Sequence, residues 1–126
     1  MLESYKNLTV WRKSIDLVQE VYILTGSFPR EETYGLVIQM RRAAVSIPSN
    51  IAEGSRRKGL PEYLRFLRTA DASSAELETQ VIISRRLYLG LDYAKVDTLL
   101  EEVQKMLSVM ISKLDTKLER GGELKV

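Results

Sequence analysis

The sequence contains no cysteine and no histidine among its 126 residues. Without cysteine there are no disulfides, thiolate nucleophiles or zinc–thiolate sites, and this composition fits a reducing, cytoplasmic setting. Without histidine the chain lacks the commonest general base at neutral pH and the commonest transition-metal ligand. A di-iron bundle built from Glu-x-x-His pairs is therefore excluded. We expect no metal site, no cofactor and no enzymatic activity.

Long apolar runs are also missing. No stretch of about 18 apolar residues occurs, and the N-terminal segment has no apolar signal core. We therefore expect an intracellular protein without a membrane partner. Only three prolines and seven glycines interrupt the chain, and 44% of its residues are hydrophobic. A chain of this length and composition is expected to form one domain with a single core.

Apolar residues recur at spacings of three and four over four stretches, which predicts four amphipathic helices. The first helix is expected to follow an N-cap at Asn7 and to end at Gly26. Two adjacent apolar rows run along it. The first row is Leu8, Trp11, Ile15, Val18 and Tyr22, and the second is Val10, Leu17, Val21 and Leu24.

The other three helices are expected to follow at short intervals. Glu31 and Glu32 suit the first turn of the second helix, because negative charge there meets the positive end of the helix dipole. Pro61 suits the first position of the third helix, and Asp92 can cap the fourth. Residues 119–126 have a glycine pair and no periodicity, so they are predicted to be a disordered tail. The fold predicted for residues 1–118 is an all-α, antiparallel up-down four-helix bundle.

Pro48 lies inside the second predicted helix, within the segment SIPSNIAEG. The apolar positions before and after it keep one helical register, so we predict that the helix continues but is kinked near Pro48. Because Pro48 has no N–H, the Ala44 carbonyl would lose its usual donor, and a proline inside a helix costs roughly 3 kcal/mol. Ser46, Ser49 and Asn50 are expected to satisfy the freed backbone groups.

The second predicted helix is apolar over more than half of its circumference. Packing inside one small bundle would not bury so wide an apolar face, and this favours a subunit interface. A central helix shielded by long side chains is the alternative. Ala43 and Ala44 are expected to let this helix approach the third closely. The residues assigned to the interface or to the kink are Ile38, Val45, Ser46, Pro48, Ser49, Asn50, Ala52 and Glu53.

Four segments carry a resemblance to a known family. They read LTVWRKSIDLV, FPREETYGLVIQMRRAAVSIPSNIAEGSRR, EYLRFLRTADASSAELETQ and KMLSVMISKL. Together they resemble the bacterial four-helix-bundle family of 23S rRNA intervening-sequence proteins, roughly over residues 5–114. The resemblance implies a four-helix bundle that assembles as a homopentamer and has no enzymatic activity. The accessory variability determinant of diversity-generating retroelements is similar, and it binds a reverse transcriptase and nucleic acid through a basic surface. A retroelement context and an rRNA-insertion context both stay open.

Positive charge is concentrated in the middle of the sequence. Nine basic and five acidic residues occur from Arg41 to Arg86. Repeated around a ring of subunits, such a patch would bind nucleic-acid phosphates. The residues assigned to nucleic-acid binding are Arg41, Arg42, Arg56, Arg57, Lys58, Arg65, Arg68 and Arg86. A solvated face with ordinary ion pairs is the competing interpretation, and it would make the chain a protein-only oligomeric scaffold.

Overall fold

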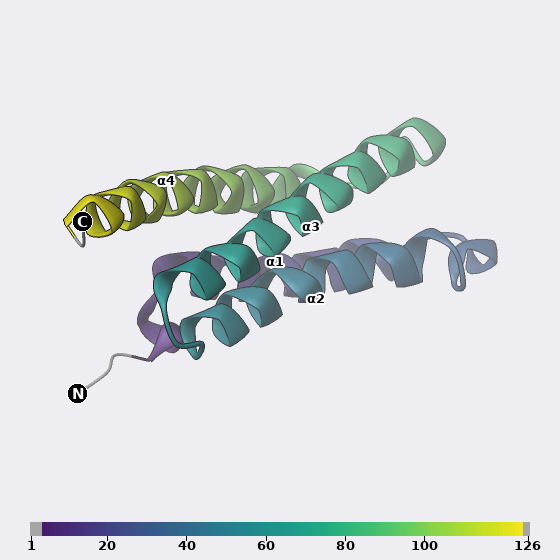
Figure 1. Ribbon diagram of the computed structural model, residues 1–126. Coiled ribbons are helices and arrows are strands. Elements are labelled where there is room, and N and C mark those ends of the chain that lie inside the picture. The colour runs from purple at the N-terminus through teal and green to yellow at the C-terminus, as the bar shows by residue number, and fades with distance from the viewer. Residues whose placement is uncertain (1–3, 125–126) are drawn as a thin grey trace.

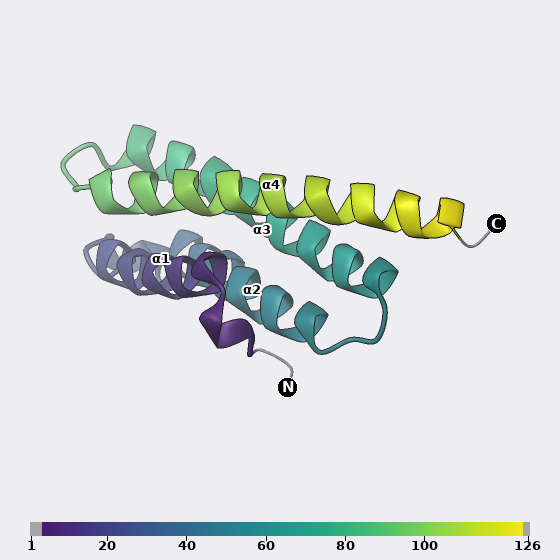
Figure 2. The ribbon, with the colours of Figure 1, turned by 90° about the vertical axis from the view of Figure 1, so that its left-hand side faces the viewer.

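The computed structural model describes residues 4–124, which form four α-helices and two short 3-10 helices and contain no strand. In chain order the elements are η1 (Tyr5–Asn7), α1 (Thr9–Thr25), η2 (Arg30–Glu32), α2 (Leu36–Ser55), α3 (Leu60–Leu87) and α4 (Ala94–Leu124). Each α-helix packs against the next one in the chain, and α4 also packs against α1 (Figures 1 and 2). The predicted all-α fold with four helices is confirmed.

The connections between the helices lie at two opposite ends of the molecule. Figure 1 shows η1, the α2–α3 connection and the last turns of α4 at one end. The α1–α2 and α3–α4 connections lie at the other end. Segments far apart in the sequence therefore meet at each end. Within the described residues, none of the helices is both long enough and apolar enough to cross a membrane.

The core lies between the four helices and consists mainly of aliphatic side chains. Its fully buried members include Leu17, Met40, Ile47, Ile51, Leu67, Leu77, Val103 and Leu107. On α1 the second predicted row faces this core, whereas Ile15 and Tyr22 of the first row are exposed. Two adjacent rows share the same helical period, so periodicity alone does not choose between them. Packing of α1 against α2 and α4 makes the choice.

The first helix begins at Thr9, one residue later than an N-cap at Asn7 predicts, because a short 3-10 turn precedes it. Asn7 belongs to η1, and Leu8 occupies the cap position of α1 without a side-chain hydrogen bond. The Ser4 side chain accepts a hydrogen bond from the Lys6 amide at 3.1 Å, and the Lys6 carbonyl accepts one from Arg12 Nε at 2.9 Å. These bonds stabilise a separate turn before the helix.

The predicted start of the second helix is also wrong. Glu31 and Glu32 lie in η2, and α2 begins only at Leu36, after Gly35 with the non-helical angles φ −112° and ψ −111°. The Glu32 carboxylate still acts at the start of α2, because its Oε1 accepts a hydrogen bond from the Leu36 amide at 3.4 Å. It also accepts a hydrogen bond from the Tyr88 hydroxyl.

Helix α2 continues through Pro48, as the apolar register predicts. The kink itself stays a prediction. Ser46 and Asn50 do not bond to the Ala44 carbonyl as expected, but to each other, to the Ser46 carbonyl and to α3. Asn50 Nδ2 donates to the Ser46 carbonyl at 2.8 Å and to Ser46 Oγ at 2.9 Å. Ser46 Oγ in turn lies 2.8 Å from Ser73 Oγ on α3.

The contact between α2 and α3 is the most extensive in the bundle. Ala43 and Ala44 are both buried, in agreement with the close approach expected from their size. Gly54 marks the tightest point, because a Cβ atom placed there would lie 2.7 Å from the Cβ atom of Phe66. Real Cβ atoms do not approach that closely. A glycine is therefore needed where the end of α2 crosses the start of α3.

The later helices begin where local signals place them. Gly59, with a φ of +85°, precedes α3, and Pro61 lies in its first turn. Asp92 Oδ1 accepts a hydrogen bond from the Ala94 amide at 3.0 Å, as a cap for α4 should. The prediction of a disordered tail is wrong for residues 119–124, because α4 continues to Leu124. Extending an existing helix adds one hydrogen bond for each residue fixed. Residues 125–126 lie outside the described residues.

Candidate nucleic-acid interface

The turn between α2 and α3 presents three consecutive cations. Arg56, Arg57 and Lys58 follow the end of α2 and are all exposed. The Arg57 guanidinium lies 4.9 Å from the centre of the Phe66 ring, and that of Arg56 lies 6.0 Å from the Tyr5 ring. Cation–π attraction of this kind positions an arginine without neutralising its charge. The turn is therefore a surface with a high density of positive charge.

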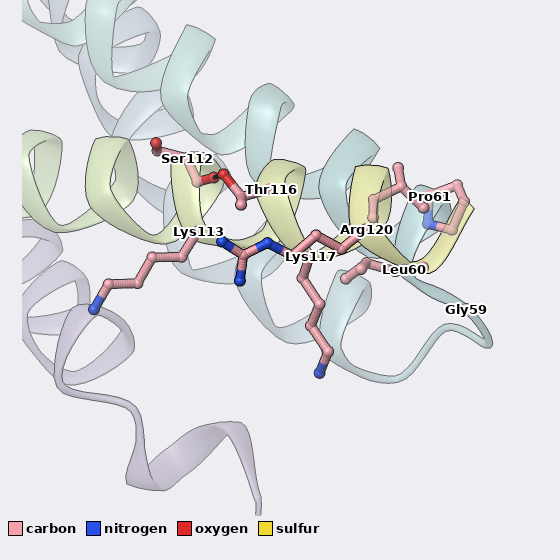
Figure 3. A pocket seen from close by; sticks show the side chains of 10 residues that line it. Gly59, Leu60, Pro61, Ser112, Lys113, Thr116, Lys117 and Arg120 are labelled. Carbon is pink, nitrogen blue, oxygen red and sulfur yellow. Dashed lines mark hydrogen bonds between the residues drawn. The ribbon is translucent and has the colours of Figure 1, made fainter. Parts of the chain in front are cut away.

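Helix α4 brings further cations to the same end. Figure 3 shows Lys113, Lys117 and Arg120 along α4, beside the segment that begins α3. Together with the first residues of α3 they line a groove of about 790 Å³. Their spacing of four and three places them on one side of the helix. We call the six residues Arg56, Arg57, Lys58, Lys113, Lys117 and Arg120 the basic end.

The α4 part of the basic end was not predicted from the sequence. The spacing of Lys113, Lys117 and Arg120 was visible, but only the fold shows that they lie beside the α2–α3 turn. None of the six basic-end residues forms an ion pair with another residue whose side chain the structure describes. Their charges are therefore available to an anionic ligand.

Two predicted binding residues at this end are already paired. Arg65 forms an ion pair with Glu62 at 2.9 Å, and Arg68 forms one with Asp115 at 2.5 Å. Both pairs are exposed to solvent, where an ion pair contributes about 0–1 kcal/mol. A phosphate would have to compete with these carboxylates, so Arg65 and Arg68 contribute less to the positive potential than the basic end does.

The remaining predicted binding residues lie elsewhere. Arg42 precedes Ser55, the last residue of α2, by thirteen positions, which corresponds to about 20 Å along a helix axis. Arg86 lies at the far end of α3, near the α3–α4 connection. Arg41 is turned toward α1, where its Nε donates to Thr25 Oγ1 at 3.0 Å. The structure does not bring the eight predicted residues into a single patch.

The residues predicted for a subunit interface differ in how exposed they are. Pro48 is buried within the bundle, so it needs no partner outside. This corrects the assignment of Pro48 to a subunit interface. Ile38 and Ala52 are half-buried, and 40% of Val45 is exposed. Ser49 and Glu53 are exposed, whereas Ser46 and Asn50 form the polar contact with α3 described above.

Comparison with known proteins fixes the family. A model of the 23S rRNA-intervening sequence protein family matches residues 6–109. The chain belongs to this family. The intervening-sequence match covers α1, α2, α3 and the first half of α4, and it ends before Lys113. The α4 part of the basic end therefore lies outside the segment that defines this chain as an intervening-sequence protein.

A solved structure shares the fold of this intervening-sequence protein. It is the crystal structure of a protein of unknown function from the S23 ribosomal protein family of Bacteroides thetaiotaomicron. The two chains are 18% identical and superpose with a TM-score of 0.70, over 82% of this chain and 98% of the other. At this identity the likeness concerns the fold alone. No curated protein matches the intervening-sequence chain.

Proposed function

We propose that this protein is a non-catalytic, homo-oligomeric four-helix bundle that binds the phosphate backbone of nucleic acid through its basic end. The observation that carries the proposal is that cations from two segments far apart in the sequence lie at one end of the bundle, without an ion pair to any side chain that the structure describes. Arg56, Arg57 and Lys58 come from the α2–α3 turn. Lys113, Lys117 and Arg120 come from α4, across the groove.

Such an arrangement suits recognition of backbone and shape more than of base sequence. The Phe66 ring is buried, and arginine side chains lie over the Tyr5 and Phe66 rings. Stacking platforms for unpaired bases require exposed rings, and the groove is lined by no aromatic residue. Phosphate contacts position a nucleic acid without reading its sequence. We therefore expect structured RNA or duplex DNA to bind with little sequence preference.

Self-association would strengthen this weak contact. The net charge of one chain is only +2, so a single basic end gives modest affinity. An oligomer presents one basic end for each subunit, and simultaneous contacts raise the overall affinity without any new interaction. The gel-shift titration therefore uses protein at a concentration at which the mass of the oligomer has been measured.

A gel-shift titration at several salt concentrations tests the binding proposal. The variant Arg56→Glu, Arg57→Glu, Lys58→Glu should bind structured RNA and duplex DNA at least about tenfold more weakly, with a shallower dependence on salt. The matched control reverses three exposed cations at the opposite end of the bundle. It carries Arg30→Glu, Arg86→Glu and Lys95→Glu, which change the net charge equally. Equal losses in both variants would show that total charge acts instead of the basic end.

A protein-only scaffold is the second candidate. The ion pairs of Arg65 with Glu62 and of Arg68 with Asp115 favour it, because they neutralise part of the charge near the basic end. This candidate predicts no gel shift even at low salt, while the mass in light scattering still exceeds that of one chain.

The proposal includes a reverse transcriptase as a protein partner, because the chain resembles the retroelement accessory protein. The genomic neighbourhood tests it. A reverse-transcriptase gene and a template repeat beside the coding sequence would support the retroelement role, followed by co-purification of the two proteins. A position inside an rRNA gene would support the intervening-sequence role instead.

A further inference from the structure

Arg41 is held rigidly without a carboxylate partner. Its Nε donates to Thr25 Oγ1 at 3.0 Å, and the Thr25 side chain is 2% exposed and itself donates to the Val21 carbonyl at 2.7 Å. The guanidinium also lies 4.3 Å from the centre of the Tyr22 ring. Arg41 is half-buried, yet it forms no ion pair with a described side chain, unlike Arg85, which pairs with Asp97. A charge that is partly withdrawn from water is stabilised by an anionic partner.

Arg41 lines a groove on the outer side of α1 and α2. The groove has a volume of about 540 Å³, and its lining residues are Tyr22, Ile38, Arg41, Arg42, Val45 and Ser46. We call it the Arg41 groove. Tyr22 and Val45 are 44% and 40% exposed, so the walls present apolar surface to solvent. Helix α2 contains no acidic residue before Glu53, so the groove is both apolar and positively charged.

A complementary surface lies on α3 of the same chain. Asp71, Ala75, Glu78 and Ile82 follow one another at spacings of four, three and four, and all four are exposed. We call them the acidic face. Asp71 and Glu78 form no ion pair with a described side chain. Ala75 between them would let another backbone approach closely. The acidic face thus offers carboxylates and apolar surface, whereas the Arg41 groove offers cations and apolar surface.

We infer that the Arg41 groove of one copy receives the acidic face of α3 from a second copy, with a carboxylate of the second copy bound to the Arg41 guanidinium. This rests on the proposed homo-oligomer and names the surfaces that build it. Two different surfaces meet in such a contact, so each copy can bind one neighbour on either side. Contacts of this kind close into rings when the rotation between copies allows it.

A protein carboxylate fits the groove better than a nucleic-acid phosphate does. The apolar side chains Ala75 and Ile82 of the acidic face can pack against Ile38 and Val45 of this groove, whereas a nucleic-acid backbone offers no comparable apolar side chains. The guanidinium is positioned by Thr25 and Tyr22 before any ligand arrives, which lowers the entropic cost of forming a paired, two-point contact. This assigns Arg41 to assembly instead of nucleic-acid binding.

Sedimentation equilibrium of the full chain tests the inference. Arg41→Ala should raise the dissociation constant of the oligomer at least about tenfold, since truncating a desolvated charge contact costs several kcal/mol. Val45→Asn should have a similar effect by removing apolar surface from the groove, without adding a charge that could pair with Arg41. Arg86→Ala removes the same charge outside the groove and should leave the mass unchanged. Circular dichroism of each variant shows whether it is folded, and the exposed position of Val45 keeps the test valid if Arg41→Ala does not fold.

A charge exchange identifies the partner surface. Arg42→Glu and Glu78→Arg should each weaken assembly alone, and the two changes in one chain should restore it at least partly. An oligomer equally stable in every variant would overturn the inference and leave the homo-oligomer standing. A wild-type chain that is monomeric at micromolar concentration would overturn both. If Arg41→Ala weakened the gel shift but not assembly, Arg41 would belong to the nucleic-acid surface and the inference would be wrong.

Discussion

The Tyr88 hydroxyl donates a hydrogen bond to the Glu32 carboxylate, which joins residues 56 positions apart in the sequence. Glu32 also accepts a hydrogen bond from the amide of Leu36 at the start of α2. The rings of Tyr88 and Phe28 pack against each other with their centres 5.4 Å apart. One carboxylate thus ties the α1–α2 connection to the end of α3, at the end of the bundle opposite the basic end.

This hydrogen bond predicts how the stability depends on pH. The bond to Glu32 is the main cause that raises the pKa of Tyr88 to about 12, with burial and nearby charge adding to it. The protonated hydroxyl is favoured in the folded state, so its contribution to the free energy of unfolding is full below pH 10. That contribution is lost as the pH rises from 10 to about 12. Urea denaturation from pH 8 to 12 should show this loss in the wild type.

Tyr88→Phe provides the comparison. Its free energy of unfolding should be lower than that of the wild type at pH 8, and the difference should shrink toward pH 12. Tyr34→Phe serves as the control, because the Tyr34 side chain is 90% exposed. A difference between wild type and Tyr88→Phe that stays constant across this pH range would mean that the bond to Glu32 does not form in solution.

Gly54→Ala should destabilise the fold through overpacking. The added Cβ atom would lie 2.7 Å from the Cβ atom of Phe66 and 3.3 Å from the carbonyl oxygen of Tyr63, so α2 and α3 would have to separate. We expect a loss of about 1–3 kcal/mol in the free energy of unfolding. Gly90→Ala is the matched control, since its Cβ would meet no atom within 4 Å. Equal effects at the two positions would contradict the close approach of the helices.

Pro48→Ala should stabilise the protein. The helix interior gains about 3 kcal/mol when alanine replaces proline, because a backbone donor is restored. Losing the burial of two carbon atoms costs about 0.8 kcal/mol for each atom. The unfolded chain also becomes more flexible without the proline ring, which costs about a further 0.4 kcal/mol. The expected net gain is about 1 kcal/mol in thermal or urea denaturation. Pro61→Ala, in the first turn of α3, should change little. A destabilised Pro48→Ala would show that the surrounding packing requires the proline ring.

The contact between Ser46 and Ser73 should be measurable by a double-mutant cycle. Their hydroxyl oxygens are 2.8 Å apart at the α2–α3 contact, and a hydrogen bond in this setting contributes about 1 kcal/mol. We expect Ser46→Ala and Ser73→Ala to show a coupling energy of about that size. Pairing Ser46→Ala with Thr79→Ala gives the control, since the Thr79 hydroxyl bonds only locally, to the Ala75 carbonyl. A coupling energy near zero for Ser46 and Ser73 would rule out a stabilising bond.

The sequence predicts those features of the fold that depend on neighbouring residues. Pro61 and Asp92 mark helix starts because the proline ring and the aspartate side chain act within one turn of their own position. Asn7 and Glu32 fail as markers because each lies in a separate 3-10 turn that precedes its helix. The Ser4 side chain binds the Lys6 amide, and Glu32 reaches the Leu36 amide from outside the helix.

The candidate site was harder to predict, because its parts come together only in the folded chain. Counting charge along the sequence groups Arg42 with Arg57, although the length of α2 separates them. The same count leaves out Lys113 and Lys117, which the bundle places beside the α2–α3 turn. Whether a cation is already neutralised depends likewise on tertiary contacts, such as the one between Arg68 and Asp115.

The last turns of α4 differ from the rest of the bundle in how little of them is buried. Past Leu107, no side chain that the structure describes on α4 is fully buried, although the helix continues to Leu124. The described side chains in these last turns are at most half-buried, so we expect the amide hydrogens there to exchange by local fraying at a small fraction of the global unfolding free energy. An anion bound at Lys113 and Lys117 would slow that exchange. Hydrogen exchange along α4 would therefore report anion binding at the basic end separately from the stability of the core.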